Sequence, residues 1–162
     1  MGEKGKEITG EVAQKVRENL ITMFAYEWLE IYFFLTSSWR MTGVSGRRVA
    51  EFLKKEGMEE LMSLEKIARR ILELGGDLPV DFSEIISIAE KNYPKKIPAR
   101  SDTLGFLRQI LEIERKEIDF LQKQCAETFG KDDVSFNLFV EMLQDEVEDA
   151  HKWSQLLKKE EK

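Results

Sequence analysis

One glutamate interrupts the apolar face of each of four long segments that have helical periodicity. In these segments apolar residues recur at three- and four-residue spacing, which is typical of a helix that buries one side. The glutamates lie in register with that pattern near the middle of each segment, and they are Glu27, Glu60, Glu114 and Glu146. An unpaired carboxylate in a dry core is costly, so each of these side chains needs a proton or a positive partner.

The sequence offers two kinds of positive partner for these carboxylates. The first is a metal site, because two divalent cations balance four carboxylates in charge and helix bundles build such sites from facing helices. The second is a buried ion-pair network, and the arginines that lie beside the apolar faces are Arg70, Arg108 and Arg115. No lysine or arginine lies in the middle of an apolar face. The sequence therefore favours the metal site and leaves the ion pairs as the alternative.

The only histidine of the chain gives a less favoured candidate. Glu148 and His151 are three residues apart, a spacing that places a carboxylate and an imidazole on one helix face. That face also carries Glu141, Gln144 and Gln155, so we expect it to be in contact with solvent. The inward residue of this segment is Glu146, followed one turn later by Asp149. The predicted metal ligands are therefore Glu27, Glu60, Glu114, Glu146 and Asp149.

The elements that position these residues are separated by a few breaks rich in glycine, proline and aspartate. The predicted long helices span about 10–42, 45–74, 102–129 and 134–160, and a shorter helix of about 82–92 is capped by Asp81. Tight turns join the first pair of long helices and the second pair, so each pair is predicted to be an antiparallel hairpin. The link between the pairs can run the length of a bundle. We expect an all-α four-helix bundle with one long crossover.

The bulk composition limits the classes of partner. The chain of 162 residues suits a single domain, predicted as 1–162 with polar tails at about 1–9 and 159–162. The net charge of −6 and the absence of a basic arm argue against a nucleic-acid partner, and no apolar run is long enough to span a membrane. The single Cys125 excludes an internal disulfide. We expect a cytoplasmic protein.

Several stretches of the sequence resemble the ferritin-like superfamily, and in particular the archaeal Dps-like ferritin group. The matching pieces are Glu27 with the following "TG" at 42–43, "ARRILELGGDLP" at 68–79, "ILEIER" at 110–115, "ETFGKDD" at 127–133 and "LQDEVED" at 143–149. The resemblance implies a ferritin-like four-helix subunit and a hollow homo-oligomeric cage of twelve subunits. It also implies oxidation of ferrous iron by peroxide or dioxygen, iron storage as ferric mineral and protection against oxidative stress.

The chain departs from this group at the histidines that the resemblance would place in the site. Ser63 and Asp149 stand at those two positions, and Lys116 stands where many members have a second cysteine beside Cys125. The remaining ligand set is all oxygen, which favours hard ions such as iron or manganese, up to two per subunit. Because serine is a poor ligand, we expect the 45–74 side of the site to lack a ligand and ferroxidase activity to be weakened.

Two other functions fit the same residues. One is a ferritin-like homologue with a degenerate metal site that acts as a structural or partner-binding subunit. The other is a small manganese or iron carboxylate protein that forms no cage. The loss of the histidines favours these alternatives, whereas the four glutamates favour a metal-binding protein.

Overall fold

Four long helices and one short helix make up the fold. The computed structural model describes residues 12–90, 93 and 96–162. Its helices are α2 (Val12–Arg40), α3 (Gly43–Glu73), α4 (Phe82–Ala89), α5 (Thr103–Thr128) and α6 (Asp133–Glu160). The all-α bundle is confirmed, and the predicted helix ends that lie within the described residues differ from the observed ends by at most two residues. The predicted tail 1–9, the helix start at 10 and the end of the short helix at 92 lie outside the described residues.

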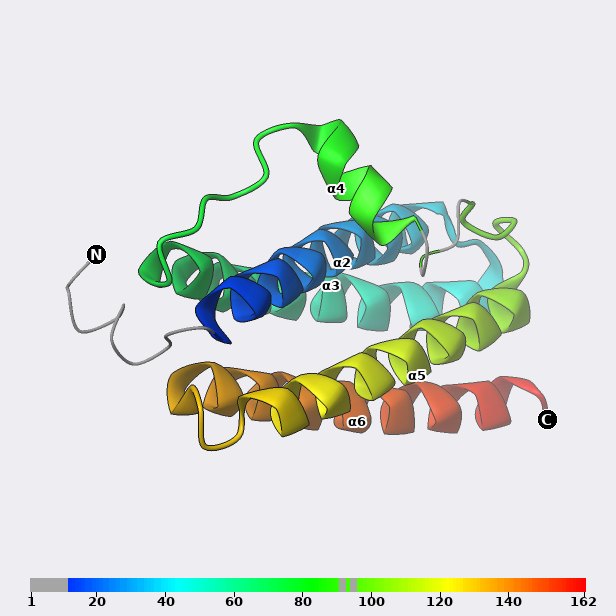
Figure 1. The fold of residues 1–162 in the computed structure, drawn as a ribbon. Coiled ribbons are helices and arrows are strands. Elements are labelled where there is room, and N and C mark those ends of the chain that lie inside the picture. The colour runs from blue at the N-terminus through cyan, green and yellow to red at the C-terminus, as the bar shows by residue number, and fades with distance from the viewer. Residues whose placement is uncertain (1–11, 91–92, 94–95) are drawn as a thin grey trace.

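The long helices form two hairpins that pack side by side (Figure 1). The turn between α2 and α3 consists of Met41 and Thr42, and the Thr42 N–H donates to the Arg100 carbonyl at 3.2 Å. The turn between α5 and α6 contains Gly130, whose φ of +68° suits glycine. At its end the Asp132 side chain caps α6 by accepting from the Ser135 N–H. Both predicted tight turns are therefore confirmed.

The crossover between the hairpins carries α4, which lies over α2 on the outside of the bundle (Figure 1). Asp81 begins this helix as predicted, because its carboxylate accepts from the Ser83 N–H at 2.8 Å. Ile85 and Ala89 are the buried residues of α4 and belong to the core cluster that also contains residues of α2. The crossover then returns to the bundle at Tyr93, which is buried.

Two apolar clusters fill most of the interior and leave a polar layer between them. The first cluster includes Leu20, Ile67, Ile71, Leu121 and Phe139. The second cluster includes Phe34, Leu53, Leu107, Ile110 and Trp153. On each long helix the predicted glutamate lies between residues of the first cluster and residues of the second. Among the described residues, no helix combines the length and the apolar character that crossing a bilayer would require.

Candidate metal centre

Each of the four long helices contributes two buried carboxylates to the polar layer. The members of each pair are three or four residues apart, so both lie on the inward side of their helix. The pairs are Glu27 and Glu30 on α2, Glu56 and Glu60 on α3, Glu114 and Glu117 on α5, and Glu146 and Asp149 on α6. Six of these side chains are at most 5% exposed, while Glu60 at 8% and Asp149 at 9% are the two that solvent reaches most easily.

The carboxylate oxygens gather in three groups that are small enough to hold a metal ion. Within each group the oxygens lie within 4.8 Å of one another, and the groups are Glu27–Glu30–Glu60, Glu30–Glu117–Glu146 and Glu56–Glu60–Asp149. Glu30 belongs to the first two groups, and Glu60 belongs to the first and third. Glu114 is hydrogen-bonded to Glu146 and so extends the second group. The carboxylates therefore form one continuous chain through the bundle.

Close packing of the hairpin helices brings the carboxylates of α2 and α3 together. Gly57 lies next to Glu56 and faces α2, where an added Cβ would be 3.2 Å from the side chains of Phe34 and Leu35. That separation is shorter than an ordinary van der Waals contact, so a larger residue would push the two helices apart. The glycine thus helps the oxygens of Glu27 and Glu60 to meet across the helix interface.

The ion-pair alternative does not account for the interior groups. Within the described ranges, no lysine or arginine pairs with Glu27, Glu30, Glu60, Glu114, Glu117 or Glu146. Arg70 pairs instead with Asp132 at 2.8 Å, Arg108 pairs with Glu161, and Arg115 is exposed. Two cations lie at the edge of the carboxylate layer in the described chain: Lys152 donates to Asp149, and Lys55 lies 3.8 Å from Glu56.

Burial and mutual repulsion raise the pKa values of the interior carboxyls. Loss of solvent is the largest cause and raises the pKa of Glu27, Glu30, Glu114 and Glu146 well above the ordinary glutamate range. For Glu27 the neighbouring charge of Glu60 is the next cause. Burial also raises the pKa of Glu60 and of Glu117 to about 7. Without a metal, these groups hold protons at pH values where an ordinary glutamate is ionised.

The residues fit hard metal ions by the chemistry of their donors. The interior groups contain only carboxylate oxygens, the ligands that hard divalent and trivalent ions prefer. Oε2 of Glu27, Glu114 and Glu117 is buried and has no hydrogen-bond partner. Leaving a buried acceptor unsatisfied is unfavourable, so a coordinated ion would remove this cost as well as the repulsion between the carboxylates.

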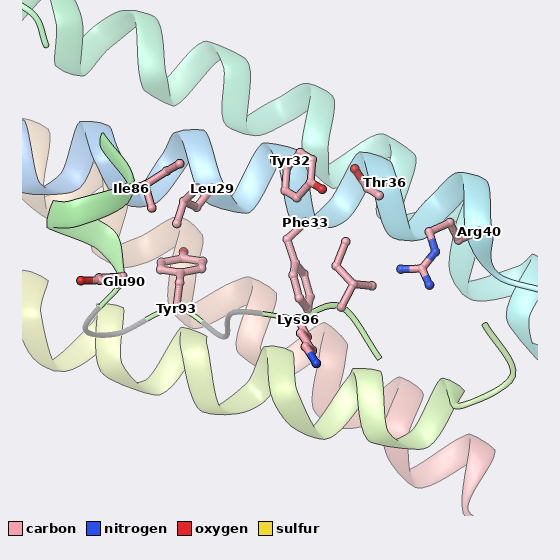
Figure 2. A pocket seen from close by; sticks show the side chains of 10 residues that line it. Leu29, Tyr32, Phe33, Thr36, Arg40, Ile86, Glu90, Tyr93 and Lys96 are labelled. Carbon is pink, nitrogen blue, oxygen red and sulfur yellow. The ribbon is translucent and has the colours of Figure 1, made fainter. Parts of the chain in front are cut away.

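Tyr93 closes one side of the carboxylate layer. Its hydroxyl donates to Glu30 at 3.2 Å and also contacts Glu117. Its ring packs against that of Tyr26 at a centroid distance of 5.6 Å. On the opposite side the ring lines a cavity of about 670 Å³ between α2, α4 and the crossover, where it lies beside Leu29 (Figure 2). The tyrosine thus separates two candidate ligands from a cavity that opens at the surface.

The structure brings the five predicted site residues into one layer, with Asp149 at its edge. As metal ligands they stay predictions. The interpretation that a single glutamate interrupts each apolar face is wrong, because Glu30, Glu56 and Glu117 are also buried. The predicted lack of a ligand on α3 stays a prediction, but Glu56, one turn before Glu60, adds a second buried carboxylate on this helix. The repeated Glu-x-x-Glu spacing at 27–30 and 114–117 was the available signal.

The residues that the sequence placed outside the site lie where expected. Glu148 and His151 are exposed on α6, which confirms that this pair is in contact with solvent, and Glu148 lies at the rim of a cavity that reaches Glu60. Ser63 is half-buried and lines a cavity that also reaches Glu60. Lys116 is paired with Glu112 on the surface of α5, and burial raises the pKa of the half-buried Cys125 thiol.

A four-helix bundle with paired inward carboxylates and one crossover defines the ferritin-like class. A family model described as a ferritin-like domain matches residues 17–162, and the chain therefore belongs to this family. The chain is 30% identical over 151 residues to the DNA protection during starvation protein of Pyrococcus furiosus, covering 93% of this chain and 81% of that protein.

Solved structures with the same fold include bacterial relatives of lower identity. The bacterioferritin-related protein of Bacteroides fragilis, described as a dodecameric thioferritin, has a TM-score of 0.88 at 23% identity, covering 97% of this chain and 93% of that one. The Dps protein of Vibrio cholerae O1, described as a member of the ferritin-like diiron-carboxylate proteins, has a TM-score of 0.78 at 13% identity, covering 90% of each chain. These likenesses establish the fold.

Proposed function

We propose that this protein binds ferrous iron at its interior carboxylates, oxidises it with peroxide or dioxygen, and stores the product inside a cage of identical subunits. The observation that carries the proposal is the chain of eight buried carboxylates, near which the described residues place only Lys55 and Lys152, both at its edge. Membership of the ferritin-like family and the similarity to the Pyrococcus furiosus protein support iron as the metal.

The reaction with peroxide balances with two ferrous ions as substrate. Each Fe(II) gives up one electron, the O–O bond breaks, and two protons complete two water molecules, leaving two Fe(III). Glu30 and Glu60 each belong to two groups, so they are placed to be shared between neighbouring ions. The carboxyls whose pKa is near 7 release protons when ions bind. These protons are then available at the site where water forms.

The chain's other residues keep this chemistry apart from bulk water. The two apolar clusters enclose the carboxylate layer from both ends of the bundle. The Tyr93 hydroxyl holds the Glu30 and Glu117 carboxylates in place from the crossover. A dry surrounding strengthens the attraction between carboxylates and cations. The protein thus fixes the positions of the ions and limits the escape of reactive oxygen species.

Assembly into a cage requires exposed surfaces that fit another copy. On α2 and α4 several large apolar side chains are exposed, including Trp28, Tyr32, Phe82 and Ile86. Tyr32 and Ile86 line the same surface cavity, and exposed apolar side chains that gather in this way are typical of a subunit contact. The description of the Bacteroides fragilis relative as dodecameric supports twelve subunits. The expected mass is about 230 kDa, twelve times the subunit mass of 18.9 kDa.

The decisive test is iron oxidation by metal-free protein. Ferrous iron is added without oxygen, then peroxide is added, and ferric absorbance is followed for the native chain and for a Glu27→Gln, Glu114→Gln double variant. We expect rapid formation of Fe(III) by the native chain and a loss of at least about ten-fold in the variant. A His151→Ala variant is the control, and we expect it to match the native chain. Equal rates with and without native protein would contradict the proposal.

A manganese protein is the second candidate, because an all-oxygen ligand set suits Mn(II) as well as iron. Metal analysis of protein purified without chelator separates the two. Iron as the main bound metal supports the proposal. Manganese in a small oligomer supports the alternative, and no bound metal in a small oligomer supports a structural subunit.

A further inference from the structure

The third carboxylate group, Glu56–Glu60–Asp149, lies between α3 and α6 and differs from the two interior groups. Each hairpin carries these buried glutamates in the same arrangement, two on its first helix and one on its second. They are Glu27, Glu30 and Glu60 in the α2–α3 hairpin, and Glu114, Glu117 and Glu146 in the α5–α6 hairpin. Four residues before Glu60 is Glu56, whereas four residues before Glu146 is the buried, apolar Met142. Glu56 therefore has no acidic counterpart at the corresponding position of the other hairpin.

The Glu56 side chain is buried and lacks a hydrogen-bond partner at Oε1. It is 1% exposed, and this oxygen belongs to the group in which Glu60 and Asp149 take part. The nearest ammonium groups are Nζ of Lys55 at 3.8 Å and Nζ of Lys152 at 3.9 Å. Both distances exceed those of hydrogen bonds. Oε1 of Glu56 therefore lies near the carboxylates of Glu60 and Asp149 and accepts no hydrogen bond.

The Lys152 ammonium lies beside the three carboxylates of this group and supplies positive charge to them. It donates to Oδ1 of Asp149 and lies near Glu56. The Lys152 side chain is 38% exposed, so the ammonium can move into solvent while its aliphatic stem stays against the protein. The other nearby ammonium, that of Lys55, donates to the exposed Glu59, so the charges of the three carboxylates stay incompletely balanced. A divalent ion would supply twice the charge of one ammonium and would also satisfy Oε1 of Glu56.

A surface cavity of about 320 Å³ leads to the same group. Glu60, Asp149 and Lys152 line it, and acidic residues around it are Glu59, Asp145 and Glu148. Lys55, Lys66 and Lys152 also line the cavity, but its five carboxylates outnumber these three lysines, so the opening attracts cations. Glu60 lines the cavity and also belongs to the interior group with Glu27 and Glu30. The cavity therefore connects the surface with the interior carboxylates.

We propose that Glu56, Glu60 and Asp149 form a third cation site, which takes hard divalent ions from solvent and passes them to the interior groups through Glu60. In the metal-free protein the Lys152 ammonium holds the place of the ion and is displaced when the ion binds. The role of the site as an entry for iron rests on the proposed function, whereas the binding of a divalent ion there does not.

The test counts Mn(II) ions bound per subunit to metal-free full-length protein without oxygen, by calorimetry and by electron paramagnetic resonance. We expect three ions for the native chain and two for Glu56→Gln, which keeps the size of the side chain and removes its charge. Glu59→Gln is the matched control, since Glu59 is exposed on the same helix and lines the same cavity. We expect the control to bind three ions.

A second variant keeps the proposal testable if Glu56→Gln fails to fold. Replacing Lys152 with methionine removes the competing ammonium and keeps the aliphatic length, so we expect Mn(II) affinity at the third site to rise by roughly ten-fold. Unchanged affinity and unchanged stoichiometry in both variants would overturn the third site, whatever the iron chemistry. Loss of one ion in Glu56→Gln, in a protein that oxidises no iron, would support the site and refute only the proposed function.

Discussion

Glu60 links the carboxylates at the edge of the bundle with those in its interior. It shares one group with Glu27 and Glu30 and another with Glu56 and Asp149. Because all these side chains are buried, each must hold a proton, contact a cation or repel its neighbours. The resulting competition between protons and metal ions has consequences for both stability and binding.

The first prediction concerns the pH dependence of stability without metal. The pKa of Glu56, Glu60 and Glu117 is raised from 4.5 to about 7 in the folded chain. The folded state then binds more protons than the unfolded state between these values, so stability falls as pH rises through this window. We expect the melting temperature of metal-free protein to drop by at least about 5 °C between about pH 5 and pH 8.

Saturation with Mn(II) provides the comparison, because bound ions replace the protons and we expect them to abolish the drop. Thermal unfolding followed by circular dichroism measures both series. A melting temperature that rises with pH in the metal-free protein would contradict the assignment of raised pKa values to the carboxylate layer.

The second prediction concerns Tyr93. Replacing it with phenylalanine keeps the ring and removes the hydroxyl that donates to Glu30 and Glu117. We expect the free energy of unfolding of metal-free protein to fall by about 1–3 kcal/mol, since Glu30 and Glu117 lose the one buried O–H donor that they share. Tyr32→Phe is the matched control, because Tyr32 lines the same cavity and is 60% exposed. Equal stability of the Tyr93 and Tyr32 variants in urea unfolding would show that the hydroxyl has no such role.

At the scale of elements, the junction between the hairpins depends on a buried ion pair. The Arg70 guanidinium near the end of α3 bonds the Asp132 carboxylate at 2.8 and 3.0 Å and the Ser135 hydroxyl at 2.8 Å. Asp132 is fully buried and also caps α6. One side chain thus fixes the start of α6 and joins it to the other hairpin.

The third prediction follows from this double role. We expect Asp132→Ala to destabilise the protein by about 2–4 kcal/mol, since it leaves Arg70 with only the half-exposed Glu73 as its ionic partner and removes a helix cap. Asp133→Ala, at the exposed neighbouring position, is expected to cost less than about 1 kcal/mol. Chemical denaturation of both variants measures the difference. A small effect at Asp132 would show that this ion pair contributes little to holding the hairpins together.

The sequence predicted the helices well because the residues at which a helix begins and ends are determined by their neighbours in the sequence. Helix breaks at Gly130 and caps such as Asp81 act through neighbouring residues, so they can be recognised without the fold. The second carboxylate of each helix is different. Glu30 and Glu117 lie three residues from a predicted glutamate, at the border of the apolar face. Whether residues at the border of an apolar face are buried depends on how the helix packs against the other helices.

Tyr93 shows a further limit of the same kind. It lies in the crossover, where no helical period assigns a direction to its side chain. Its position beside Glu30 and Glu117 follows from the path of the crossover over α2, which is a property of the whole fold (Figure 1). Sequence patterns identify the carboxylates that interrupt apolar faces, but they do not identify a partner brought from a distant segment.

At the scale of the whole molecule, the exposed apolar residues of α2 and α4 predict the contact between subunits. The fourth prediction is that Ile86→Glu breaks the assembly, because a charge buried in a subunit contact costs more than association gains. Ile86 is 43% exposed in the single chain, so the fold itself should tolerate the change. We expect the variant to elute as a smaller species in size-exclusion chromatography with light scattering. Elution of both proteins as monomers would contradict the cage.

The central claim is that the interior carboxylates bind iron, and anomalous diffraction at the iron edge tests it most directly. Crystals of metal-free protein are soaked with Fe(II) in the absence of oxygen. The account predicts anomalous peaks inside the bundle, among Glu27, Glu30 and Glu60 and among Glu30, Glu117 and Glu146. An interior without any peak, in crystals whose surface carboxylates bind iron, would contradict it.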